Sequence, residues 1–240
     1  MTIEKRLEKL EKESAELKKA TTTPPKYRVV KLSTQKVIRT NQIILEDENG
    51  KTRAFLNTNK GEVSLWMSDE NGTPRIGISV NENMPKLSLA DESGKTRVRL
   101  SMEMETGPIL GLLDESGEVR AALGVLKNGP ILGLYDETGK ARASLEVDKE
   151  GPTLGLYDET GKAHASLVVD KEGPTLGLFD ENGKGRTSLA VDKFGPGLKM
   201  HDENSNTRAA LGVLKSGPAL LLLDESGKII WSTLGSQPDV

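Results

Sequence analysis

Cysteine is absent from the 240 residues, which excludes disulfides, thiol catalysis and cysteine metal sites. The two histidines, His164 and His201, have no cysteine or second histidine nearby. Aromatic residues make up 3% of the chain, and no run approaches the ~18 apolar residues of a membrane-spanning helix. Residues 1–20 are charged throughout and lack the apolar segment of a secretory signal. We therefore expect no membrane insertion, and either a cytoplasmic protein or part of a phage or surface fibre exported by other means.

A large excess of either charge sign is also lacking. The chain has 33 Lys and Arg residues against 36 Asp and Glu residues, so its net charge is −3. Proteins that bind nucleic acid through its phosphates need a basic excess. The balance therefore predicts no nucleic-acid partner.

What the chain does have is an internal repeat. Asp-Glu pairs recur nine times at a spacing of 22 residues, with one spacing of 23. A fixed period of this kind is the signature of a repeat architecture. The single extra residue falls within 102–106, where we expect a bulge or a longer loop. The aspartates, each taken as position 0 of its copy, are Asp47, Asp69, Asp91, Asp114, Asp136, Asp158, Asp180, Asp202 and Asp224.

Each copy contains two stretches of alternating apolar residues. Positions −4 and −2 are apolar in every copy, and positions +7, +9 and +11 are apolar in nearly all of them. A period of two indicates half-buried strands rather than helices. Each copy is therefore expected to form two strands of about seven residues.

The turns between these strands have clear signals. Asp-Glu-x-Gly suits a type I turn in which glycine takes the final, positive-φ position. The other end of most copies carries Gly-Pro, as at Gly151, where proline can begin a strand. A four-residue loop at 159–162 would place Leu156 opposite Ala165 and Leu154 opposite Leu167. The apolar residues would then share one face of an antiparallel meander.

Position +6 is basic in most copies. We interpret this ladder as repeated ion pairing with the Asp-Glu turns, because neighbouring acids would cancel the field that a polyanion needs. A polyanion-binding ladder is the alternative. The residues are Arg53, Arg75, Arg97, Arg120, Arg142, Arg186 and Arg208, with His164 in an eighth copy.

The N-terminus has a different pattern, with residues alternating four and three apart as in the a/d seam of a coiled coil. Arg6 with Glu11, and Glu13 with Lys18, have the g–e relation that suits a parallel homo-oligomer. We predict a coiled-coil oligomerisation helix over 1–20, a linker and lead-in strands over 21–42, and nine β-repeats over 43–240. The predicted oligomerisation residues are Ile3, Leu7, Leu10, Ser14 and Leu17.

A heptad helix followed by D-E-x-G-K-x-R-A-x-L-x-V copies resembles a group of uncharacterised bacterial repeat proteins. Similar units occur in trimeric phage tail fibres. The ending 224–231, with sequence DESGKIIW, also resembles the closing copy of that group. Some members have an apolar anchor after the heptads, where this chain has Ala-Thr-Thr-Thr at 20–23. The resemblance implies a fold and no activity.

A single-layer meander exposes its apolar face and needs a second layer. The favoured fold is an all-β repeat fibre with an N-terminal coiled-coil helix, in which three chains pack as a trimeric β-prism. The alternative is a monomeric β-solenoid with 22-residue rungs. Tight turns at both ends of each copy favour the homotrimer.

Nothing in the sequence predicts a catalytic residue, a cofactor or a metal site, because the paired carboxylates are repeated turn residues. We expect a non-catalytic structural fibre or stalk that assembles as a homo-oligomeric rod. The alternative is a binding fibre, similar to an adhesin or a phage tail fibre. Such a fibre would use Tyr135, Tyr157 and Phe179 at position −1 for lateral fibre or carbohydrate contact. The simpler interpretation is that these rings cover stems of nearby Lys or Arg residues, such as Lys162 or Arg142.

Overall fold

The computed structural model describes residues 5–6, 8–14, 39–59, 61–104 and 106–234. The chain divides into two units, Met1–Thr40 and Asn41–Val240. In the first unit, residues 5–6 and 8–14 are helical, and Lys9 pairs with Glu13 one turn later at 3.9 Å. No helix within the described ranges is long and apolar enough to cross a membrane. Of the predicted linker and lead-in strands over 21–42, residues 21–38 lie outside the described residues, and the first described strand begins at Gln42.

The second unit is all β. Its first nine strands are β1 (Gln42–Glu46), β2 (Thr52–Asn59), β3 (Glu62–Ser68), β4 (Pro74–Asn81), β5 (Met84–Ala90), β6 (Thr96–Glu103), β7 (Gly107–Leu113), β8 (Val119–Leu126) and β9 (Gly129–Tyr135). The other nine are β10 (Ala141–Val147), β11 (Pro152–Tyr157), β12 (Ala163–Asp170), β13 (Gly173–Phe179), β14 (Gly185–Asp192), β15 (Gly195–His201), β16 (Thr207–Leu214), β17 (Gly217–Leu223) and β18 (Ile229–Ser232). Each repeat therefore supplies two strands, as its period-two pattern predicts.

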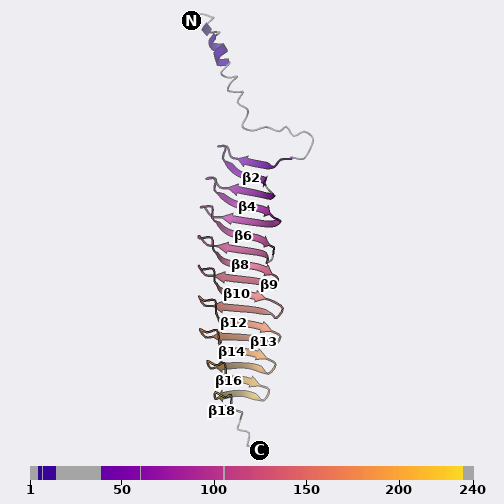
Figure 1. Ribbon diagram of the computed structural model, residues 1–240, viewed down its shortest axis with the longest axis vertical. Helices are drawn as coiled ribbons and strands as arrows, with labels where there is room; N and C mark the ends of the chain where they lie inside the picture. The colour runs from indigo at the N-terminus through magenta and orange to yellow at the C-terminus, as the bar shows by residue number, and fades with distance from the viewer. Residues whose placement is uncertain (1–4, 7, 15–38, 60, 105, 235–240) are drawn as a thin grey trace, which may run out of the picture. The chain divides into compact units, whose positions relative to one another are not determined.

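These strands form one antiparallel meander. Every strand pairs with its neighbour in sequence, from β1–β2 through to β17–β18, and the sheet is neither closed nor curled (Figure 1). The solenoid alternative is therefore wrong. Parallel rungs need long crossover connections, whereas the turns here are only long enough for hairpins.

The register within each hairpin confirms the shared apolar face. Leu154 lies opposite Leu167, and Leu156 lies opposite Ala165. The turn that produces this register differs from the expected four-residue loop. The Asp158 N–H donates to the Lys162 carbonyl at 2.9 Å and the Gly161 N–H donates to the Asp158 carbonyl at 3.1 Å, so the loop has three residues. A β-bulge after Ala163 then restores the alternation of faces.

The Gly-Pro ends form tighter turns. Asp170 pairs with Gly173, which leaves a two-residue turn, and Glu103 pairs with Gly107 across one residue more. The longer loop expected within 102–106 is thus confirmed. At Gly151 the backbone has φ of 132°, and a Cβ atom would collide with the Val169 carbonyl of the following hairpin. Glycine is required there both for its φ and for close approach.

The strands give the sheet two unlike faces. We call positions −6, −4, −2, +7, +9 and +11 the leucine face, because they carry proline, leucine, alanine and valine in most copies. Positions −5, −3, −1, +8 and +10 form the ring face, which carries mainly glycine, serine, threonine and aromatic residues.

Candidate functional site

The leucine face has no covering layer in the described part of the chain. Many of its leucines and valines remain about half exposed along the whole sheet: Leu123 is 52% exposed, Leu156 is 47% and Leu189 is 50%. A continuous apolar surface on this scale marks an interaction surface in a soluble protein.

The ring face is largely covered by its own side chains. Tyr157 folds back along its strand so that its ring lies over Gly155, and Tyr135 lies over Gly133 in the same way. The Tyr157 hydroxyl also shares a hydrogen bond of 3.0 Å with the Ser144 hydroxyl on the preceding strand, β10. Serines and glycines are among the most buried residues of this face, and Ser144 is only 6% exposed.

Phe179 lies over the sheet in the same position one copy later. A Cβ atom at Gly177 would lie 3.1 Å from one edge of its ring, and one at Gly185 would lie 3.9 Å from the other edge. The ring therefore spans two glycines on adjacent strands. The structure thus places the three aromatic residues of position −1 on the face opposite the leucines, each over a glycine of its own strand.

The aspartate turns form one edge of the sheet. Asp158 accepts hydrogen bonds through Oδ1 from the Thr160 hydroxyl at 2.7 Å and from the Lys162 N–H at 3.0 Å. Corresponding hydroxyl bonds from Ser93 and Thr138 lower the pKa values of Asp91 and Asp136 to about 2. These carboxylates therefore accept hydrogen bonds within their own turns and stabilise them.

Basic side chains link each turn to the next copy. Arg142 pairs with Asp136 at 3.5 Å, and its Nε donates to the Tyr157 carbonyl at 3.0 Å. Lys140 Nζ donates to the Glu159 carbonyl at 2.7 Å. The expected ion pairing of the Arg ladder is therefore confirmed. In the sixth copy, His164 takes the place of the arginine and pairs with Asp158 at 3.1 Å.

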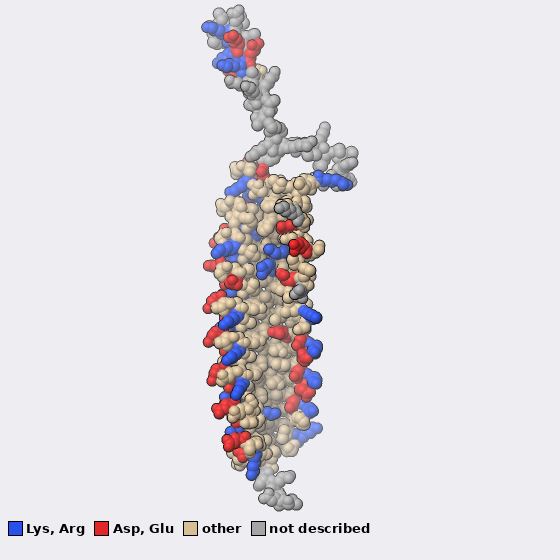
Figure 2. Space-filling view, viewed as in Figure 1, with Lys and Arg blue, Asp and Glu red and all other residues tan. Residues whose placement is uncertain are grey.

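Figure 2 shows the resulting charge distribution on one face of the molecule. Basic and acidic side chains gather in two columns over the turns, and the surface between them is mainly uncharged. Because both signs alternate along each column, neither edge presents a field of one sign.

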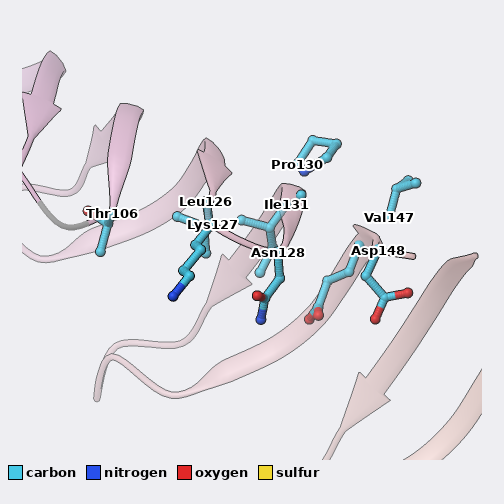
Figure 3. A pocket seen from close by; sticks show the side chains of 10 residues that line it. Thr106, Leu126, Lys127, Asn128, Pro130, Ile131, Val147 and Asp148 are labelled. Atoms are coloured by element: carbon cyan, nitrogen blue, oxygen red, sulfur yellow. The ribbon is translucent and has the colours of Figure 1, made fainter. Parts of the chain in front are cut away.

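A hollow of about 250 Å³ lies at the Gly-Pro edge, between the β8–β9 turn and the end of β10. In Figure 3 the side chains of Lys127, Asn128 and Asp148 extend to one side, while Pro130 and Val147 extend to the other. Asp148 accepts the Glu150 N–H at 2.9 Å and so belongs to its own turn. Among the described residues no cluster of three His, Asp or Glu side chains could hold a metal ion.

Few of the predicted oligomerisation residues can be placed. Leu10 and Ser14 lie in the described helix, where Leu10 is 63% exposed. Ile3, Leu7 and Leu17 lie outside the described residues. The coiled-coil seam stays a prediction.

Sequence reasoning missed the glycines of position −3. Glycine occupies position −3, two residues before the −1 side chain, in four consecutive copies: Gly111, Gly133, Gly155 and Gly177. At the last three of these, the aromatic ring of position −1 packs over the glycine. The recurring Gly-Leu-Tyr or Gly-Leu-Phe segment was a signal that could have found them, because a strand glycine often marks a close approach.

No family model matches this chain, and no curated protein matches it. Among solved structures it is similar to the crystal structure of TcdB2-TccC3-TEV, with 12% identity and a TM-score of 0.22. It is also similar to TcdB2-TccC3 without its hypervariable C-terminal region, with 11% identity and a TM-score of 0.21. Each match covers 76% of this chain, and the chain spans 13% of those proteins.

Proposed function

We propose that this chain is a non-catalytic structural rod or stalk that assembles as a homotrimer through its leucine face. The observation that carries the proposal is the uncovered apolar surface on one side of every repeat. Burying apolar surface stabilises by about 25 cal/mol per Å², so a partner layer along the whole face would contribute strongly.

A second copy of the chain is the partner that fits this surface. The leucine face repeats every two strands, and a partner with the same period can match it along its full length. The two edges of the sheet carry both charge signs, so neighbouring chains in the assembly would not repel each other. Three chains that pack their leucine faces around one axis would then form a prism.

The heptads support three copies in parallel. Ile3 at a d position and Leu7 at an a position match the combination that favours trimers or tetramers over dimers, although the other d positions carry leucine. Fewer than three heptads are marginal alone, so the helix and the leucine face must act together.

Light scattering tests this proposal. A homotrimer has three times the chain mass of 26.0 kDa, about 78 kDa. A mass of one chain contradicts the homo-oligomer, and a mass of two chains contradicts the trimer. Leu10→Asp places a charge in the predicted seam and should weaken assembly, and an unchanged mass in that variant would argue against the helix as a clamp.

A binding fibre is the second candidate function. It is favoured by the aromatic rings of position −1, which recur in neighbouring copies on the face that the trimer leaves outside. In this case the rod presents those rings to a ligand.

A further inference from the structure

We propose that the ring face binds an extended, uncharged polysaccharide along a row formed by Tyr135, Tyr157, Phe179 and His201, which we call the ring row. The proposal names the ligand class of the binding fibre, and it rests on the leucine face being the covered one.

The strongest feature is a hollow of about 300 Å³ beside Phe179. The ring of Phe179 and the imidazole of His201 line it, together with the hydroxyl side chains of Ser166, Thr175 and Ser188. A ring accompanied by a few convergent polar groups is the general form of a small-molecule site.

The hydroxyls in this hollow are available to a ligand. In the preceding copy, Ser144 is bonded to the Tyr157 hydroxyl at 3.0 Å. Phe179 has no hydroxyl, and within the described part of the chain Ser166, Thr175 and Ser188 make no side-chain hydrogen bond. The replacement of Tyr by Phe thus leaves a free hydroxyl beside an apolar ring. This combination matches a pyranose, which has an apolar C–H face and a rim of hydroxyls.

The spacing of the rings favours a chain of sugars over a single one. Successive −1 residues lie two strands apart, or about 9.6 Å. This distance is close to the repeat of two sugars in an extended β-1,4-linked glycan, so alternate sugars could stack on successive rings.

The charges near the ring row favour an uncharged ligand. Arg142 and Arg186 donate to the backbone carbonyls of Tyr157 and His201, and each is paired with its own aspartate, at 3.5 Å and 3.3 Å. The paired carboxylates cancel the attraction of these arginines for an anionic chain.

Titration calorimetry with cellohexaose and with N-acetylchitohexaose, two extended β-1,4-linked hexasaccharides, tests the proposal. Maltohexaose is the control, because its α-1,4 linkages curve the chain away from a straight row of rings. The full-length chain should bind at least one of the two extended hexasaccharides and should not bind maltohexaose. Failure to bind either extended sugar overturns the proposal, and so does equal binding of maltohexaose.

Two variants locate the site. Phe179→Ala should weaken binding about tenfold or more, which corresponds to about 1.4 kcal/mol. Ser166→Ala removes one free hydroxyl with little effect on packing and should weaken binding by a smaller factor. If Phe179→Ala does not fold, Ser166→Ala still tests the site, and wild-type affinity in that variant contradicts it.

Phe194→Ser is the matched control. Phe194 is 64% exposed in the β14–β15 turn, outside the ring row, so this variant should bind as the wild type does. A loss equal to that of Phe179→Ala would overturn the assignment. Light scattering on the same samples keeps the two proposals separate: a trimer that binds no sugar overturns this inference alone, and a monomer that binds sugar overturns only the trimer.

Discussion

The leucine face and the ring face belong to the same strands, yet their side chains differ in how far they are covered by the chain itself. On the ring face, Tyr157 lies over Gly155 and bonds to Ser144, so the chain covers its own sheet. On the leucine face the side chains are aliphatic in most copies, and leucines such as Leu123 and Leu189 remain about half exposed. The comparison indicates that large side chains beside glycines cover a face from within, whereas the aliphatic side chains of the leucine face leave that face exposed.

A charge on each face should separate them most strongly. Leu167→Asp on the leucine face should abolish assembly, because an uncompensated charge in an apolar contact costs several kcal/mol. Val168→Glu is the control on the opposite face, where Glu146 already occupies the same position in another copy. Light scattering should report a lower mass only for Leu167→Asp. Equal loss of mass in both variants would refute the assignment of faces.

Acid should weaken the edges rather than the faces. The turn carboxylates have folded pKa values below the ordinary 3.8, and those of Asp91 and Asp136 are about 2. Their contribution is therefore complete above about pH 4 and is lost as the pH falls towards 2. The melting temperature, measured from pH 7 to pH 2, should fall over this lower range.

Asp91→Asn should flatten that pH dependence and lower the melting temperature at neutral pH. Glu92→Gln is the control, since the Glu92 side chain takes no hydrogen bond from the described residues. A pH profile of Asp91→Asn that matches the wild type would contradict the role of this turn.

Glycine replacements should show how closely adjacent hairpins approach. Gly151→Ala introduces a Cβ against the Val169 carbonyl and should destabilise by about 2 kcal/mol or more. Gly217 has φ of 123° but open space around it, so Gly217→Ala should lose only the conformational part, about 1 kcal/mol. Urea denaturation measures both. Equal losses would show that φ alone requires glycine at these positions.

The smallest effect is expected at the one histidine of the basic ladder. Arg side chains elsewhere donate to a carbonyl of the following copy, as Arg186 does to His201 at 3.1 Å. His164→Arg should add the equivalent bond to Phe179 and stabilise by about 0.5 kcal/mol. Thermal unfolding at neutral pH should show a slightly higher midpoint, and a lower midpoint would count against this link between copies.

Local pattern was sufficient for most of the fold. The 22-residue period, the apolar alternation and the Asp-Glu-x-Gly turns predicted paired antiparallel strands with Leu154 opposite Leu167, as found. The same reasoning left the solenoid open, because alternation alone does not say which strand lies beside which. It also predicted four residues in the loop after Asp158, where the structure has three. A three-residue loop followed by a β-bulge gives the same pairing of apolar residues as a four-residue loop, so the hydrophobic pattern does not distinguish them.

The sequence by itself determined the strand segments and their turns, the ion-paired edge and the segregation of leucines to one face, because each depends on residues close together in the chain. Only the tertiary structure decided how rings and glycines meet. Phe179 contacts Gly177 on its own strand and Gly185 on the next, and the free hydroxyl of Ser166 comes from the strand on the other side. Such contacts depend on side-chain direction and on the pairing of separate strands, which no local pattern specifies.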